Sequence, residues 1–210
     1  MKEFDTYLFD FDGTLVDSYE SLVKVFEGAY QKVGVKVPHG YTLRLMRCPL
    51  YVGYQELNGP EDEESKKIFG EEIIRLLDDP EVLKATKAYK EVKEVLSTLF
   101  SNGKRLGIVT SNSNKHVREV LSFLNMDEKM FSVIVGNEAT KKHKPNPDPI
   151  YKALEILNIG KDNVCYVGDA IDDMNTALNA KVTPILVDRF FEHGNSCELT
   201  IYTLDELLKY

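Results

Sequence analysis

The amino-acid sequence predicts an α/β protein, a doubly wound parallel sheet with a helical segment inserted after the first strand. From about residue 84 onward, short apolar runs alternate with stretches of helical periodicity. Between the first strand and residue 83, by contrast, apolar residues recur at helical spacing. Because helices cover a parallel sheet on both faces, its strands are continuously apolar, as the strand-like runs of this chain are.

The first expected strand spans residues 7–11 and ends in a turn at Asp12 and Gly13. The block that follows carries apolar residues at helical spacing and no convincing strand. Its expected helices span residues 18–34, 41–57 and 59–80. The expected domains are therefore an α/β core of residues 1–16 and 84–210 and a helical insertion of residues 17–83.

The alternating part of the chain supplies the rest of the sheet and the helices that cover it. Its expected strands span residues 105–111, 131–136, 163–169 and 183–188. Its expected helices span residues 91–103, 114–125, 147–160, 172–180 and 204–210. In such a sheet, ligands bind at the carboxyl ends of the strands, so the residues just after each strand are candidates for function.

Composition and charge exclude several classes of function. The 210 residues carry a net charge of −8 and contain no basic stripe that could neutralise nucleic-acid phosphates. No apolar stretch approaches the length of a membrane span, and the N-terminus does not resemble a signal peptide. The scattered cysteines and histidines favour neither a disulfide framework nor a zinc site. We expect a cytoplasmic monomer or homodimer with no nucleic-acid or membrane partner.

Acids, hydroxyls and lysines follow the predicted strands at one edge of the sheet. Asp10 and Asp12 are two apart in an extended segment, so their side chains point to the same side. Like charges placed so close are unfavourable unless something offsets them. The complete set at this edge is Asp10, Asp12, Gly13, Thr14, Thr110, Ser111, Asn112, Lys141, Lys142, Lys144, Gly168, Asp169, Asp172 and Asp173.

A divalent cation accounts for this concentration of acids. Mg²⁺ is suited to a site whose ligands are oxygen atoms and mostly charged, such as the carboxylates of Asp10, Asp12 and Asp169. The ion would also admit a phosphate, which bare carboxylates repel. One carboxylate of the Asp10 and Asp12 pair can then act as a nucleophile, and the other can transfer protons. The joint pattern favours phosphoryl transfer on a small phosphorylated substrate.

Each of these segments also has a local explanation when it is taken alone. Residues 12–14 form an ordinary turn sequence, and residues 110–112 are a natural N-cap cluster for the helix that follows. Lys144 is explained as a solvated loop lysine. Asp169 and Asp173 are explained as acids that interact with a helix dipole. The occurrence of all of them at one predicted edge favours a site.

Four segments of the sequence resemble the motifs of a known family. "FDFDGTLVDS" (residues 9–18) resembles the first motif of the haloacid dehalogenase superfamily of phosphohydrolases almost letter for letter. "GIVTSN" (107–112) resembles the second motif, "KPNP" (144–147) the third and "VGDAIDD" (167–173) the fourth. The likeness covers essentially the whole chain and implies a Rossmann-like catalytic core, with the helical insertion as its cap.

This resemblance implies a role for each matching residue. Asp10 is the implied nucleophile and Asp12 the implied general acid and base. Mg²⁺ would be bound by Asp10, Asp169 and the backbone carbonyl of Asp12, with Asp173 supporting the ligands from outside. Thr110 and Lys144 would stabilise the pentacoordinate transition state. The implied phosphate-binding residues are Gly13, Thr110, Ser111 and Lys144.

The second acid of the first motif narrows the expected activity. Members that act as dehalogenases lack an acid equivalent to Asp12, and the ATPase pumps have Thr there. The resemblance therefore implies a Mg²⁺-dependent phosphatase that forms an aspartyl-phosphate, similar to phosphoglycolate phosphatases. The alternatives are a sugar phosphomutase similar to β-phosphoglucomutase and, from another class, a non-catalytic binding protein on the same scaffold.

The expected cap departs from the family at two places. "MRCPLYVGYQEL" (residues 46–57) is similar to a cap segment of Gly-Pro-Pro-Leu type, but Arg47 stands where Gly is usual. "AYKEVKEVLSTL" (88–99) resembles a Tyr-Pro-Gly-Val helix start, with Lys90 and Glu91 in place of Pro-Gly. Arg44 or Arg47 is a candidate contact for an anionic substrate, and a plain surface position is the alternative for both.

Overall fold

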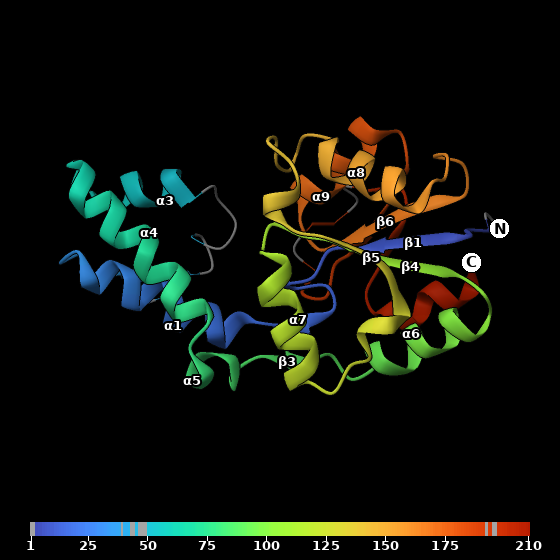
Figure 1. Ribbon diagram of the computed structural model, residues 1–210, viewed down its shortest axis with the longest axis horizontal. Helices are drawn as coiled ribbons and strands as arrows, with labels where there is room; N and C mark the ends of the chain where they lie inside the picture. The colour runs from blue at the N-terminus through green and yellow to red at the C-terminus, as the bar shows by residue number, and fades with distance from the viewer. Residues whose placement is uncertain (1–2, 39, 43–44, 46–49, 192, 195–196) are drawn as a thin grey trace. The chain divides into compact units, whose positions relative to one another are not determined.

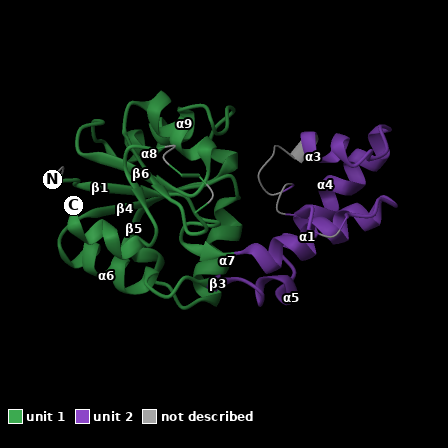
Figure 2. Cartoon of the chain, turned by 180° about the vertical axis from the view of Figure 1, so that it is seen from behind, with its two compact units in different colours: residues 1–17, 88–210 green, residues 18–87 purple. Residues whose placement is uncertain are grey.

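The computed structural model describes residues 3–38, 40–42, 45, 50–191, 193–194 and 197–210. The chain divides into two compact units, which are described separately. One consists of residues 1–17 and 88–210 and the other of residues 18–87 (Figure 2). Two short strands, β2 (Val16–Asp17) and β3 (Lys87–Ala88), pair where the chain passes from one unit to the other. Neither strand was expected, because two residues are too few to show a periodic pattern.

The larger unit is built on a six-stranded sheet with the order β5-β4-β1-β6-β7-β8, in which every neighbouring pair is parallel. The prediction of a doubly wound parallel sheet is confirmed. The first strand of the chain, β1, lies between β4 and β6, so its carboxyl end is central in the edge. The strands are β1 (Thr6–Phe9), β4 (Arg105–Val109), β5 (Phe131–Val135), β6 (Val164–Gly168), β7 (Thr183–Val187) and β8 (Thr200–Ile201).

Helices cover the two faces of this sheet. Figure 1 shows α8 and α9 on one face and α6 on the other, and α8 and α9 also pack against each other. The helices are α6 (Val92–Ser101), α7 (Asn114–Phe123), α8 (Asp148–Leu157) and α9 (Ile171–Ala180). Three single-turn or short 3₁₀ helices, η1 (Glu128–Met130), η2 (Asn137–Ala139) and η3 (Leu204–Lys209), complete the unit. The last of them replaces the α-helix expected over residues 204–210.

One hydrophobic cluster of the larger unit lies between β1, β4, β5 and β6 and the helices α8 and α9, and α6 buries its apolar residues on the other face of the sheet. Tyr166 in β6 is completely buried in this cluster, as are Leu8 in β1 and Ile150 in α8. Helix α8 is amphipathic, with Ile150 and Leu154 turned to the sheet, and it ends at Asn158 in the left-handed region (φ 52°). Burial of this kind stabilises a core by about 25 cal/mol per Å² of apolar surface removed from water.

Apart from Lys87 in β3, the described residues of the smaller unit form helices and the turns and loops that join them. Its helices are α1 (Tyr19–Lys32), α3 (Leu50–Glu56), α4 (Glu63–Leu77) and α5 (Pro80–Leu83). Helices α1 and α4 pack together around three aromatic rings, with the ring of Phe69 centred 4.7 Å from those of Tyr30 and Tyr54. Among the described residues, no helix combines the length and apolar character that a membrane crossing requires.

Candidate active site

Strand β1 delivers Asp10 to the centre of the carboxyl edge of the sheet. Asp10 follows Phe9 directly, and its backbone N–H donates to the carbonyl oxygen of Val167 in β6 at 2.8 Å. This bond extends the β1–β6 pairing beyond the last strand residue and fixes where the side chain begins. Asp10 is only 6% exposed. The carboxylate is therefore buried against the neighbouring strand end rather than placed in a solvated turn.

Lys144 joins Asp10 to Asp173. Its Nζ atom lies 2.7 Å from Oδ1 of Asp10 and 2.7 Å from Oδ1 of Asp173, and its side chain is 11% exposed. It also donates to the hydroxyl oxygen of Tyr166 at 3.3 Å, and that hydroxyl donates to the carbonyl of Val109 at 2.8 Å. The explanation of Lys144 as a solvated loop lysine is wrong, because burial and two ion pairs hold it inside the site.

The turn after β1 packs against Asp169. Gly13 adopts φ +77°, and a Cβ atom built on it would lie 2.3 Å from Oδ2 of Asp169. The Thr14 hydroxyl donates to Oδ1 of the same carboxylate at 3.3 Å. Glycine is required at position 13 for two reasons, since both the left-handed backbone and the close approach exclude a side chain. The first and fourth motifs are therefore in direct contact.

Three carboxylates meet in this region. One oxygen each of Asp10, Asp169 and Asp173 can be chosen so that all three lie within 4.8 Å of one another. Burial raises the pKa of Asp10 well above its usual range, and Asp173 and Asp169 raise it further against the opposing effect of Lys144. Burial, with Asp173 beside it, raises the pKa of Asp169 to about 7.

The charge balance of the cluster fits a divalent cation. Burial disfavours the charge of Lys144, but Asp10 and Asp173 outweigh it and raise the pKa of the ammonium group well above its usual value. One lysine nevertheless faces three carboxylates, and the neighbouring carboxylates add to the effect of burial in raising the pKa values of Asp10 and Asp169. A compact group of carboxylate oxygens is the donor set that hard cations such as Mg²⁺ prefer. The residues present therefore fit a metal ion.

Asp173 has its carboxylate engaged by the protein itself. Oδ1 accepts from Lys144, and Oδ2 accepts from the backbone N–H of Ala170 at 3.1 Å, at the start of α9. The expected helix-start role of Asp173 is thus correct in part, because this bond satisfies the backbone N–H group of the N-cap residue. With both oxygens hydrogen-bonded, Asp173 is suited to orienting its neighbours.

The side chain of Asp12 is held by a residue that follows β4 and not by the cluster of Asp10, Asp169 and Asp173. The amide nitrogen of the Asn112 side chain donates to Oδ2 of Asp12. The backbone N–H of Asn112 in turn donates to the Thr110 hydroxyl oxygen at 3.1 Å, so β1 and β4 are linked at their carboxyl ends. Asn112 was placed at the edge by the sequence but not among the site residues. Its position directly after the expected strand of residues 105–111 was the available signal.

The remaining candidates differ in their surroundings. Thr110 is 5% exposed at the end of β4, whereas Ser111 is exposed. The N-cap of α7 is Ser113, whose hydroxyl accepts from the His116 N–H at 3.1 Å. The interpretation of residues 110–112 as the helix cap is therefore wrong. Arg44 and Arg47 lie outside the described residues.

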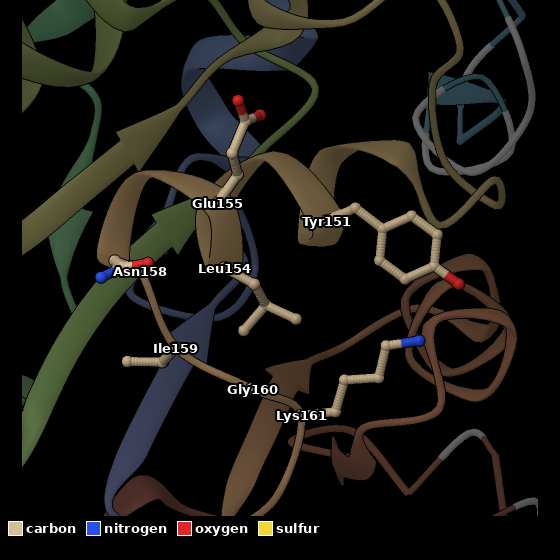
Figure 3. A pocket seen from close by; sticks show the side chains of 7 residues that line it. All are labelled: Tyr151, Leu154, Glu155, Asn158, Ile159, Gly160 and Lys161. Carbon is tan, nitrogen blue, oxygen red and sulfur yellow. The ribbon is translucent and has the colours of Figure 1, made fainter.

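A surface depression of about 580 Å³ lies at the edge of the sheet formed by the amino ends of the strands (Figure 3). It is formed where α8 ends and the chain turns into the amino end of β6, whereas the carboxylates lie at the carboxyl ends of the strands. The depression is thus separate from the acid cluster. Its lining residues are Tyr151, Leu154, Glu155, Asn158, Ile159, Gly160 and Lys161.

Comparison with known proteins agrees with this fold. The model of the haloacid dehalogenase-like hydrolase family matches residues 7–187, from β1 through β7. The chain therefore belongs to the haloacid dehalogenase-like hydrolase family, and the prediction of an enzyme of this superfamily is confirmed. The match includes all four motifs that carry Asp10, Thr110, Lys144 and Asp169.

Relatives and a solved structure resemble the chain over most of its length. A protein of Caldanaerobacter subterraneus provisionally named pyrophosphatase PpaX is 33% identical over 181 residues, which cover 86% of this chain and 80% of that protein. A phosphoglycolate phosphatase of Photorhabdus laumondii is 25% identical over 210 residues, covering 95% and 87%. The crystal structure of a provisionally assigned haloacid dehalogenase-like hydrolase from Bacteroides fragilis superposes with a TM-score of 0.84 at 26% identity, covering 98% of this chain and 100% of that one.

The substitution Gly13→Ala should weaken metal binding. The new Cβ would collide with the Asp169 carboxylate, and the left-handed backbone would cost about 1–2 kcal/mol of folding stability. Gly103→Ala is the matched control, because Gly103 has φ +75° with nothing within 4 Å of the added atom. Thermal unfolding should show a stability loss in both variants, larger at position 13 because of the collision, and calorimetric titration with Mn²⁺ should show a metal defect only at position 13. Equal metal affinity in both variants would contradict this account.

The substitution Asp169→Asn should stabilise the metal-free chain at high pH. The folded-state pKa of about 7 exceeds the ordinary value of 3.8, so the folded state binds more protons between these values and stability falls as pH rises. Asparagine removes that penalty, and in chelator at pH 8 we expect a gain of at least about 1 kcal/mol that vanishes near pH 4. Denaturant melts across this range measure it, with the exposed Asp172→Asn as control. A variant less stable than the parent at pH 8 contradicts the expectation.

Proposed function

We propose that this chain is a Mg²⁺-dependent phosphatase that hydrolyses a small phosphomonoester through an aspartyl-phosphate on Asp10. The observation that carries the proposal is the bridge from Lys144 to the buried carboxylates of Asp10 and Asp173, with the half-buried Asp169 beside them. Such a cluster of like charges is unfavourable unless a cation offsets it, and a bound cation would in turn attract an anionic ligand. Family membership and the phosphatase names of two relatives support the same class.

Asp10 and Asp169, with the backbone carbonyl of Asp12, are the residues proposed to hold Mg²⁺. Asp173 supports them from outside, since its own oxygens are engaged by Lys144 and by the start of α9. The bound ion would supply electrostatic stabilisation for the charge of the phosphoryl oxygens. Lys144 supplies a second positive charge beside Asp10, and it stays protonated because its pKa is raised.

Asp10 is the proposed nucleophile. A carboxylate oxygen of Asp10 forms a bond to phosphorus while the bond from phosphorus to the leaving oxygen breaks. Asp12 enters this step as the carboxylic acid and gives its proton to the leaving oxygen. In the second step the Asp12 carboxylate takes a proton from water, whose oxygen bonds to phosphorus as the acyl-phosphate bond breaks. Asp10 is then restored and inorganic phosphate is released.

The phosphoryl oxygens need hydrogen-bond donors around this position. Lys144 is the proposed charged donor, and the residues at the ends of β1 and β4 are the proposed neutral ones. They are the groups expected from the motifs, namely Gly13, Thr110 and Ser111. Thr110 is buried beside Asn112 at the carboxyl end of β4, and its hydroxyl hydrogen is still available for donation after the oxygen accepts from Asn112.

The proposed substrate is a small phosphorylated metabolite. Pyrophosphate and phosphoglycolate are the first compounds to assay, because two relatives bear the names of enzymes for them. The helical unit, residues 18–87, is proposed to act as the cap, with Arg44 and Arg47 still predicted as contacts for an anionic substrate. A cytoplasmic location likewise stays a prediction.

The substitution Asp10→Asn should abolish phosphate release while the chain remains folded. The amide is a much weaker nucleophile than the carboxylate, and it removes one proposed metal ligand. The assay is phosphate release from a panel of phosphate esters and pyrophosphate with Mg²⁺, with and without chelator. Asp5→Asn is the control, since Asp5 precedes the same strand at its opposite end. Full turnover by Asp10→Asn would rule out the covalent mechanism.

The substitution Asn112→Ala should lower kcat by about tenfold, part of the 10²–10⁴-fold that general acid–base catalysis supplies. The reason is that Asn112 donates to Asp12 and orients it. If it acts through Asp12, the double variant Asp12→Asn with Asn112→Ala should be no slower than Asp12→Asn alone. Steady-state kinetics of the four proteins tests this. Additive losses would show that Asn112 acts by another route.

A further inference from the structure

A buried arginine that the proposed chemistry does not use lies near this site. Arg189 follows β7, and its side chain is 8% exposed. Its guanidinium contacts two other segments of the larger unit, the residues just before α6 and the loop after β1. NH1 donates to Oε1 of Glu91 at 2.6 Å, NH2 donates to the carbonyl oxygen of Thr14 at 2.9 Å, and the group lies 3.6 Å from the centre of the Tyr89 ring.

These contacts hold the arginine in one orientation. A buried guanidinium is costly unless it is paired, and Glu91 provides the opposite charge. Burial opposes the charge of Glu91, but its own backbone N–H and Arg189 outweigh that effect and lower the pKa of the carboxyl group. Tyr89 stacks against the face of the guanidinium, an arrangement suited to arginine and not to lysine. Arg189 therefore acts as a fixed donor toward Thr14.

Thr14 connects this arrangement to the proposed metal ligand. Its carbonyl accepts from Arg189, and its hydroxyl donates to Oδ1 of Asp169 at 3.3 Å. Thr14 is fully buried, and the adjacent Gly13 lies against the same carboxylate. Any change in the backbone at residue 14 thus alters where the hydroxyl meets Asp169. Arg189 is separated from Asp169 by this one residue.

We propose that Arg189, held by Glu91 and Tyr89, is a positioning residue that fixes the Thr14 backbone and thereby the Asp169 carboxylate for metal binding. The proposal rests on the proposed role of Asp169 as a metal ligand. The proposal also accounts for one position, Glu91, at which the sequence departs from the family pattern. Glu91 stands where the resembling helix start has Gly, and a glycine would leave Arg189 without its carboxylate partner.

A purely structural role for Arg189 makes a different prediction. In that case Arg189 ties the chain after β7 to α6, and its loss would lower stability without changing the affinity for metal. Metal affinity measured on the substrate-free protein therefore separates the two roles. Removal of a group that orients metal ligands from outside typically lowers the metal affinity by about 10–100-fold.

The experiment is calorimetric titration of the chelator-treated protein with Mn²⁺, with thermal unfolding measured on the same samples. Arg189→Lys cannot both pair with Glu91 and reach Thr14, so it should bind Mn²⁺ about tenfold more weakly. Thr14→Val should show a loss of the same order, and Thr14→Ser should restore the parent affinity. Arg118→Lys is the matched control, because Arg118 pairs with Glu128 at 2.7 Å on the exposed surface of the same unit.

The possible outcomes are distinct. Weaker Mn²⁺ binding in Arg189→Lys but not in Arg118→Lys supports the proposal. Parent affinity in Arg189→Lys, with binding lost in Asp169→Ala, overturns the positioning role and leaves the proposed metal site standing. Parent affinity in Asp169→Ala as well overturns both. If Arg189→Lys fails to fold, Glu91→Gln takes its place, since it keeps the arginine and removes the charge that orients it.

Discussion

One lysine set among three carboxylates, of which Asp10 and Asp173 are buried and Asp169 is half-buried, is the constraint on which the rest of this structure depends. Lys144 satisfies one oxygen of Asp10 and one of Asp173, and both acids would be costly to bury without it. These residues come from three separate segments of the chain, so their contacts depend on the tertiary structure. The parallel order β5-β4-β1-β6 brings the carboxyl ends of the strands that precede Lys144, Asp10 and Asp173 to one edge of the sheet, so the charge cluster depends on the fold.

Two glycines allow the acids to come so close to the backbone. A Cβ atom on Gly13 would overlap the Asp169 carboxylate, and one on Gly168 would lie 2.5 Å from the Cγ atom of Asp173. The backbone at the ends of β1 and β6 therefore forms part of the wall of the cluster. Burial against backbone rather than water is also what raises the pKa of Asp10 and Asp169, because it penalises their charged forms.

The sequence allowed the sheet and the edge to be predicted because both follow from local signals. Apolar runs mark the strands, and strand ends in a parallel sheet share one edge, so Asp10, Lys144, Asp169 and Asp173 could be expected together. Side-chain contacts between residues that are far apart in the sequence leave no such local signal. The bond from Asn112 to Asp12 and the reach of Arg189 to Thr14 depend on side-chain directions that periodicity does not encode. The roles of all these residues remain predictions.

The two acids of the first motif differ in surroundings, and the difference suits different duties. Asp10 is buried, paired with Lys144 and crowded by two further carboxylates, so its oxygens are oriented and poorly hydrated. Asp12 is only half-buried and is held by a neutral amide donor. A group that must exchange protons with a leaving oxygen and with water needs such access, whereas a nucleophile gains from exclusion of water. A separation of two positions along one extended segment is enough to place Asp10 and Asp12 in these two environments.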